Sequence, residues 1–234
     1  MATIYNHYRI SSQKNNMKNF SYLNAWLKGD EQIPHFDKLI ESIPDYNTTF
    51  WLNIVDEIPF YKIKEEKIIG FEESYDINRG YYYNAIETAH QYDDNSLDNE
   101  DRYNIIEELG KPPNVSYPIY MIYIEKDDIR KIVYIGKSSS NISRFRGGHS
   151  TAIKLLNPIY DGYSKIIMLC NIMLYTTNDY YLPLEFVKDK KLGLEILDDV
   201  ESRLINNYKP ELNRQKMWLF RSDGATCFGQ TVPL

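Results

Sequence analysis

The sequence predicts an α+β fold, and its clearest strands and helices lie in the second half. Residues 119–124, 132–136 and 165–175 are rich in β-branched and aromatic side chains and are bounded by polar clusters, as strands are. Residues 192–208 instead place apolar side chains at helical spacing and stop before a proline. Because both kinds of pattern follow one another in the same stretch, we expect a domain built from strands and helices together.

The first half is predicted to hold further elements of both kinds. Residues 21–43 suit two amphipathic helices separated by a glycine and a proline. Residues 48–55 and 60–71 are rich in β-branched and aromatic residues with polar alternation, which favours strands. Residues 74–92 contain three consecutive tyrosines, and the pattern leaves a strand and a helix both open.

An acidic segment and a short helix end the first half. Residues 93–101 are acidic and not periodic, which favours a solvated loop, with phosphate mimicry or autoinhibition as the alternative. Residues 103–109 are predicted to form a short helix, ended by Gly110 with two prolines beyond it. The Gly-Lys-Pro-Pro sequence that starts at Gly110 is therefore the best candidate for a boundary between the two halves.

The segment between the second and third strands of the second half carries a helix signal. The side chains at positions 140 and 141 are Ser and Asn, and either can cap a helix. Gly147 and Gly148 are expected to bend or break this helix, and residues 151–156 resume it.

The net charge of −6 hides an uneven distribution. Residues 1–115 hold 11 Lys and Arg against 20 Asp and Glu, whereas residues 116–234 hold 16 against 13. No acidic residue lies between Asp128 and Asp161. A phosphate backbone responds to local charge, so the acidic total does not exclude nucleic acid as a partner.

The composition excludes several classes of protein. Two cysteines, Cys170 and Cys227, are too few for a disulfide scaffold or a cysteine-rich zinc site. The N-terminus lacks the pattern of a signal peptide, and the longest apolar run, residues 166–175, is too short to span a membrane. We therefore expect a cytoplasmic protein with no membrane partner.

One carboxylate falls on the apolar side of the last predicted helix. At about 100° per residue, Glu201 lies within the arc defined by Leu197, Val200, Leu204, Ile205 and Tyr208. A carboxylate that faces a core costs roughly several kcal/mol unless it is paired or binds a metal. The helix alone leaves two roles for Glu201 equally open: a metal ligand, or a structural salt bridge to a Lys or Arg.

Two tyrosines and three basic residues complete the pattern. Taken singly, Tyr120 and Tyr134 fit buried core tyrosines, and Arg144, Arg146 and His149 fit a solvated helix face. Their order and spacing, however, resemble the GIY-YIG nuclease superfamily over residues 117–214. The matching parts are Pro118-Ile119-Tyr120, Tyr134-Ile135-Gly136, Arg144, His149, Glu201, and Asn213 after Lys209-Pro210-Glu211-Leu212. The sequence departs from the family at Pro118, where a glycine is usual, and at His149, which stands one residue later.

The resemblance implies a fold and a division of the chain. The fold is a small, mostly antiparallel three-stranded sheet flanked by helices, carried by a nuclease domain over residues 116–214. Residues 1–115 would be an N-terminal α+β extension for DNA recognition and dimerisation, and residues 215–234 a C-terminal tail. The implied activity is hydrolysis of DNA phosphodiester bonds with one Mg²⁺ ion, for which Mn²⁺ is expected to substitute, and with no small-molecule cofactor.

The resemblance also assigns roles to individual residues. Glu201 would be the metal ligand, and Arg144 would hold the scissile phosphate, a task for which a guanidinium fork suits better than a lysine. Tyr120 would lie against the attacking water, and Tyr134 and His149 would complete the catalytic set. Three further residues are expected to support the site: Lys137, Arg146, which would share the phosphate, and Asn213, which would lock the last helix to the sheet.

Two questions stay open at this point. The general base is either Tyr120, favoured by the resemblance, or His149, whose imidazole titrates near neutrality. The leading function is a type II restriction endonuclease that acts as a homodimer on double-stranded DNA, because a two-fold protein matches a palindromic site. A homing or repair endonuclease of the same superfamily, or a catalytically inactive DNA-binding protein, are the alternatives.

Overall fold

The structure is a computed structural model, and it describes residues 22–30, 50–65, 69–90, 96–139, 150–176 and 181–213. Its strands are β1 (Phe50–Pro59), β2 (Ile119–Lys126), β3 (Ile129–Lys137), β4 (Ser164–Tyr175) and β5 (Tyr181–Pro183). Its α-helices are α1 (Tyr22–Lys28), α3 (Phe71–Ala89), α4 (Asn99–Leu109), α5 (Ser150–Lys154) and α6 (Lys190–Tyr208). Short 3₁₀ helices are η1 (Phe60–Glu65), η2 (Pro158–Tyr160), η3 (Leu184–Phe186) and η4 (Glu211–Asn213).

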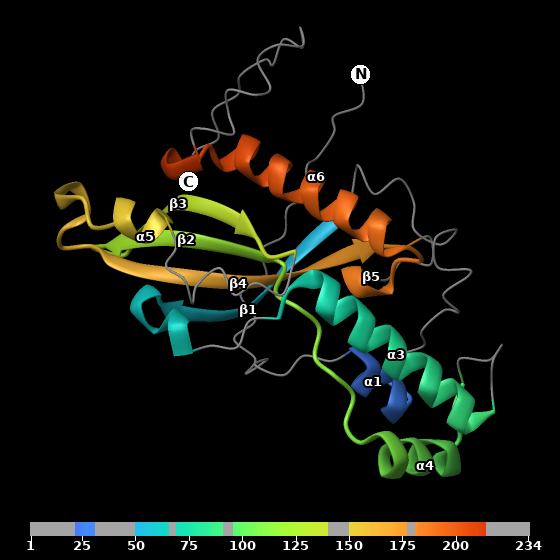
Figure 1. Cartoon of the computed structure of the whole chain (residues 1–234). Helices are drawn as coiled ribbons and strands as arrows, with labels where there is room; N and C mark the ends of the chain where they lie inside the picture. Colours follow the sequence, from blue (N-terminus) through green and yellow to red (C-terminus); the bar gives the residue numbers. More distant parts are fainter. Residues whose placement is uncertain are drawn as a thin grey trace, which may run out of the picture.

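The five described strands form one antiparallel open sheet in the order β1-β4-β2-β3, with β5 paired to β4 (Figure 1). The predicted α+β class is confirmed, but the sheet holds five strands where three were expected. The reason is the length of β4. Its first part pairs with β2, its end pairs with β5, and β1 follows its opposite edge.

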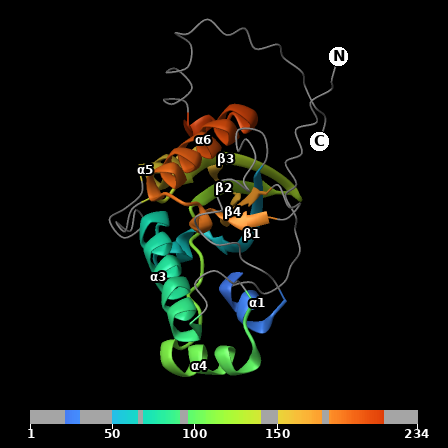
Figure 2. The same ribbon diagram turned by 90° about the vertical axis from the view of Figure 1, so that its right-hand side faces the viewer.

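Strand β1 therefore brings part of the first half of the chain into the sheet of the second half. It pairs with β4 from Phe50↔Leu174 to Pro59↔Ile166. The predicted boundary near residue 115 separates two stretches of sequence, but both contribute to one sheet. Figure 2 shows where the rest of the first half lies: α1, α3 and α4 are grouped together, and α3 starts beside the first turns of α6, where Phe71 packs against Gly193.

Two predictions for the first half are corrected by the structure. Residues 60–71 were expected to be a strand, yet Phe60–Glu65 is a 3₁₀ helix and α3 begins at Phe71. Residues 93–101 were expected to be a loop, but α4 begins at Asn99. The Asp98 side chain accepts from the backbone N–H of Glu100 and Asp101, and Asp101 completes a capping box. Acidic residues thus start this helix instead of preventing it, because they complement its N-terminal dipole.

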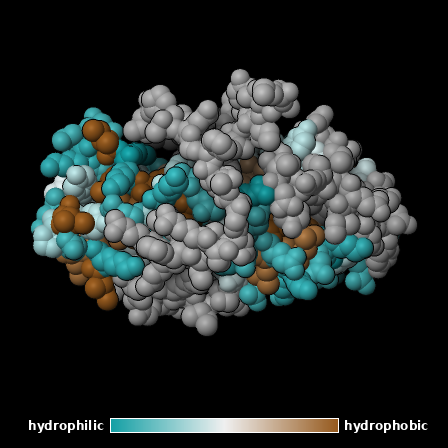
Figure 3. All heavy atoms as spheres, turned by 90° about the horizontal axis from the view of Figure 1, so that it is seen from above, coloured by the Kyte–Doolittle hydropathy of each residue, from teal (hydrophilic) through white to brown (hydrophobic). Residues whose placement is uncertain are grey.

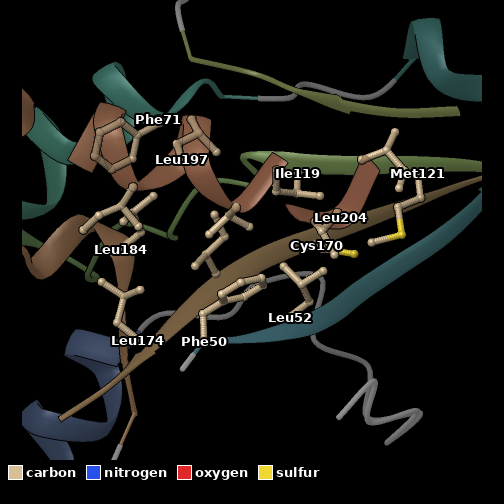
Figure 4. Close-up of a cluster of buried hydrophobic side chains, with 14 of the residues drawn as sticks. Phe50, Leu52, Phe71, Ile119, Met121, Cys170, Leu174, Leu184, Leu197 and Leu204 are labelled. Atoms are coloured by element: carbon tan, nitrogen blue, oxygen red, sulfur yellow. The ribbon is translucent and has the colours of Figure 1, made fainter. Parts of the chain in front are cut away.

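The main core lies between the sheet and α6. Leu197, Val200 and Leu204 of α6 pack against Ile119 and Met121 of β2, together with side chains from β1, β3, β4 and the start of α3 (Figure 4). A second cluster on the opposite face of the sheet includes Tyr120, Ile122, Leu155, Tyr160 and Leu169. A third cluster joins α1, α3 and α4 through Trp26, Tyr82 and Ile105. Strands β2 and β4 are therefore buried on both faces over most of their length, whereas the first three residues of β3 are exposed.

A buried carboxylate ties α3 and η3 to the segment that leads into β2. Glu185 is 1% exposed, and its Oε1 accepts from Ser74 Oγ at 2.8 Å, Ser116 N at 2.7 Å and Ser116 Oγ at 2.5 Å. Burial raises the pKa of this carboxyl, and the serine donors oppose that shift. The contact links the helical part of the first half to the sheet, so it contributes to how the chain's two halves are fixed together.

Within the part of the chain that the structure describes, no helix combines the length and the apolar character needed to cross a membrane.

Candidate active site

The two motif tyrosines come together on one face of the β2–β3 hairpin. Tyr120 of β2 pairs with Gly136 of β3, and Tyr134 is two residues before Gly136, so all three share a face. The rings of Tyr120 and Tyr134 have their centroids 6.0 Å apart with an interplanar angle of 30°. Tyr120 is 1% exposed and Tyr134 is half-buried. The hairpin therefore delivers a pair of phenols, one enclosed and one partly accessible.

Gly136 provides the space that this arrangement needs. A Cβ atom at Gly136 would lie 2.5 Å from both Cζ and the hydroxyl oxygen of Tyr120, and 2.8 Å from Cε1 of Tyr134. Both distances are shorter than any real carbon contact, so only glycine lets the two rings lie across the strand. Because β3 is at the end of the sheet order, the phenol of Tyr120 reaches across it toward the free edge of the sheet.

Asn213 closes that free edge. Its Oδ1 accepts from the backbone N–H of Ile135 at 2.8 Å, and its Nδ2 donates to the carbonyl of Ile135 at 2.7 Å. The two bonds satisfy the outward backbone groups of an edge strand between Tyr134 and Gly136. Asn213 follows α6 through η4, so these bonds attach the chain after α6 to the strand that carries the phenols.

Glu201 is buried, as its position on the helical arc predicts. It is 3% exposed, in the middle of α6. The ammonium nitrogen of Lys137, the last residue of β3, lies 3.9 Å from its Oε2 and also pairs with Asp198 one turn earlier on α6. The contact with Lys137 is the ion pair that the sequence left open as the alternative role for Glu201.

The phenols and the carboxylate lie on opposite faces of β3. Tyr120 and Tyr134 belong to the cluster away from α6, whereas Glu201 comes from the helix that covers the other face. Both groups lie beside the C-terminal end of β3, because the phenols pack over Gly136 and the adjacent Lys137 contacts Glu201. The described contacts thus bring these groups to the last two residues of one edge strand.

The three basic residues of the predicted site cannot be placed. Arg144, Arg146 and His149 lie outside the described residues. The chain enters that segment from Ser139, shortly after Lys137, and leaves it at Ser150, where α5 begins. Their expected roles as phosphate ligands and as catalytic partner stay predictions.

The described acidic groups near the site offer few ligands for a metal ion. Among the described residues, no group of three or more His, Cys, Asp or Glu side chains could hold a metal ion by itself. Glu201 and Asp198 offer two carboxylates at the end of β3, on either side of the Lys137 ammonium. This donor set fits Mg²⁺, which is commonly held by one or two carboxylates together with substrate phosphates and water.

Asp198 was missed in the sequence because it lies outside the apolar arc of the last helix. Its side chain is 63% exposed, yet it pairs with Lys137 beside Glu201. The spacing of three residues between Asp198 and Glu201 was the available signal, because residues three apart on a helix are neighbours.

A separate groove lies at the far end of the hairpin. It has a volume of about 400 Å³ and lies between the β2–β3 turn and η2, with Ile129, Ile159 and Lys131 among its lining. Figure 3 shows apolar side chains exposed among polar ones at this end of the molecule. Tyr120 is the second residue of β2, and the turn begins at Asp127, about 23 Å further along at the rise of a strand. The groove is therefore distinct from the site at the end of β3.

The comparisons with known proteins find no relative. No family model matches the sequence, and neither the curated proteins nor the solved structures include a significant match.

Proposed function

We propose that the chain is a metal-dependent endonuclease that hydrolyses phosphodiester bonds in double-stranded DNA. The observation that carries the proposal is the gathering of chemical groups at the end of one edge strand. Two phenols lie over Gly136, and the next residue, Lys137, contacts a carboxylate that is 3% exposed on α6. These residues follow one another along the chain in the same order as the motifs of the GIY-YIG nucleases that they resemble.

The chemistry of phosphodiester hydrolysis calls for groups of these types. Negative charge accumulates on the scissile phosphate in the transition state, so a fixed cation such as the Lys137 ammonium would stabilise that state. Arg144 would add a guanidinium that can bind two phosphate oxygens at once. A phenol at Tyr120 would orient the attacking water, and His149 remains the other candidate for the general base.

Glu201, with Asp198, would hold the Mg²⁺ ion that the proposal requires. A bound Mg²⁺ would supply further stabilisation of the negative charge that develops on the phosphate. Lys137 already contacts both carboxylates, so a bound metal would have to share them with the ammonium. Mn²⁺ prefers the same oxygen ligands and is expected to replace Mg²⁺.

The extra segments favour a restriction-type enzyme within this class. The first half supplies β1 to the sheet and a separate helical cluster of α1, α3 and α4, which is more structure than a linker contains. We propose that this part of the chain contributes to DNA recognition and to a homodimer on a palindromic site. The protein would then belong to a restriction system.

A digest of plasmid DNA tests the proposed activity. We expect discrete fragments in the presence of Mg²⁺ and intact plasmid in the presence of EDTA, with all fragment ends sharing one short sequence. Gel analysis and sequencing of the ends provide the measurement. A smear would reject sequence-specific cleavage, and a nick or a cut remote from the shared sequence would favour a homing or repair endonuclease. Intact plasmid under all metal conditions would reject the nuclease.

One observation favours the second candidate, an inactive DNA-binding protein. The 3.9 Å contact between Lys137 and Glu201 is what a purely structural ion pair would look like. In that case the carboxylate would be neutralised by the lysine and would be needed for stability alone. Replacement of Glu201, described in the Discussion, separates the two candidates.

A further inference from the structure

The groove at the far end of the β2–β3 hairpin exposes large apolar side chains. Two residues that line it, Ile129 and Ile159, are 68% and 67% exposed. Ile153 of α5 and Leu156, just after this helix, are 74% and 78% exposed. Figure 1 shows α5 at the same end of the sheet as the β2–β3 turn. Single exposed apolar side chains are ordinary on a protein surface, but several gathered at one end indicate a binding surface.

The shape of the groove is fixed by buried and hydrogen-bonded residues in its walls. Ile124 is 5% exposed and Tyr160 is 3% exposed. The hydroxyl of Tyr160 donates to Oε1 of Glu211 at 2.6 Å, and the ammonium of Lys131 donates to Oε2 at 2.7 Å. The volume of about 400 Å³ is in the range of pockets that enclose a ligand. The groove is therefore a formed hollow that can take an aromatic side chain.

The charges at the groove favour a partner that is apolar and flanked by cations. The ion pair between Lys131 and Glu211 neutralises both of these lining residues. At the turn, the exposed carboxylates of Asp127 and Asp128 outnumber the ammonium of Lys126. Duplex DNA would bring phosphates close to these carboxylates, so a basic peptide suits this end of the molecule better than a nucleic acid does.

The sequence that follows the last described residue has this character. Glu211 lines the groove, and the described chain ends two residues later at Asn213. Residues 217–220 are Met-Trp-Leu-Phe, with Lys216 directly before them and Arg221 directly after. An extended chain spans about 13 Å over four residues, so this apolar segment begins within reach of the wall from which the chain leaves.

We propose that the groove binds residues 217–220 of the same chain as a docked peptide. The aromatic and aliphatic side chains of this segment would cover Ile129 and Ile159, which removes apolar surface of both partners from water. The cations of Lys216 and Arg221 would face the carboxylates of the turn. The inference is independent of the proposed function, because the groove is distinct from the site at the end of β3.

A nitroxide label beside the docked segment tests the proposal in the full-length chain. The label is attached to Ser222→Cys in a chain that also carries Cys227→Ser. The remaining thiol, Cys170, is 0% exposed and is not expected to react with the label. NMR spectra of the isotope-labelled protein, recorded with the nitroxide oxidised and then reduced, measure which backbone amides lie near it.

We expect the amide signals of Ile129 and Ile159 to weaken at least tenfold when the nitroxide is oxidised. The amide of Tyr103, whose side chain is 65% exposed on α4, should change less than twofold. Replacing Trp218 and Phe220 together by Ser removes the two aromatic side chains and should reduce the broadening at the groove at least threefold. The same spectra report whether each variant is folded.

Phe228→Ser is the matched control, because it removes an aromatic side chain from the same part of the chain outside residues 217–220. It should leave the broadening unchanged. The proposal is overturned if the Trp218 and Phe220 replacements leave the broadening at Ile129 and Ile159 as it was. A mixture of isotope-labelled chains and separate nitroxide-labelled chains provides the other decisive result. Tenfold weakening at the groove in that mixture would show that a second copy supplies the segment, and would overturn docking within one chain.

Discussion

A chain with Gln in place of Glu201 is expected to cut DNA roughly 100-fold more slowly or worse, a loss typical of removing one electrostatic contributor to a transition state. Gln keeps the shape of the side chain and removes the charge that would hold the metal. Because Glu201 is 3% exposed beside Lys137, the charge acts in a poorly solvated position where its electrostatic effect is strong. Initial rates on an end-labelled duplex in Mg²⁺ measure the loss.

The control for this variant is Glu195→Gln on the same helix. The side chain of Glu195 is 57% exposed and lies 4.0 Å from the ammonium of Lys191, so its replacement should leave the rate unchanged. Thermal unfolding of both variants should stay close to the wild type. If Glu201→Gln unfolds at a much lower temperature while the cleavage rate per folded molecule is unaffected, the carboxylate is a structural partner of Lys137 and not a metal ligand.

Replacement of Gly136 by Ala is expected to remove cleavage and to destabilise the fold. The added Cβ would stand 2.5 Å from the ring and the hydroxyl of Tyr120 and 2.8 Å from Tyr134, so both phenols have to move. Overpacking of this kind costs about 1–3 kcal/mol. Denaturant unfolding measures the stability change, and the cleavage rate of the folded fraction measures the displacement of the phenols.

Gly80→Ala separates this effect from the ordinary consequence of adding a methyl group. Gly80 lies inside α3, and a Cβ there has nothing within 4 Å. Alanine in a helix interior is favoured over glycine by about 0.5–1 kcal/mol, so this variant should be slightly more stable and equally active. An active Gly136→Ala enzyme with wild-type stability would contradict the packing that the site depends on.

The elements predicted well from the sequence are those in which apolar residues form a long run or recur at a regular spacing. Strands β2, β3 and β4 and helix α6 agree with the predicted segments to within a few residues, because apolar runs and a helical arc mark them. The strand predicted over residues 60–71 was wrong because its aromatic and β-branched content also suits a 3₁₀ helix followed by the buried start of α3. The pairing of β1 with β4 was not predictable, since it depends on contacts more than a hundred residues apart.

For the candidate site, too, the sequence predicted local features but not the contacts between distant segments. The position of Glu201 within the apolar arc of the last helix predicted that it would be buried, because burial of this kind follows from one helix alone. That Lys137 contacts it could not be predicted, since this requires the distance between β3 and α6. Which face of the sheet each group occupies also depends on tertiary packing. The sequence gathers the phenols and Glu201 into one set, whereas the fold puts them on two faces of the same strand.

The most direct test of the account is the location of the metal in the presence of DNA. Mn²⁺ is added to isotope-labelled protein bound to an uncleavable duplex, and paramagnetic broadening of backbone amide signals is followed by NMR. The account predicts that the amides of Gly136, Lys137 and Glu201 broaden first, at one metal per chain, and that Glu201→Gln abolishes this. Broadening centred on the β2–β3 turn, or no DNA-dependent broadening at the end of β3, would contradict a nuclease site at this place.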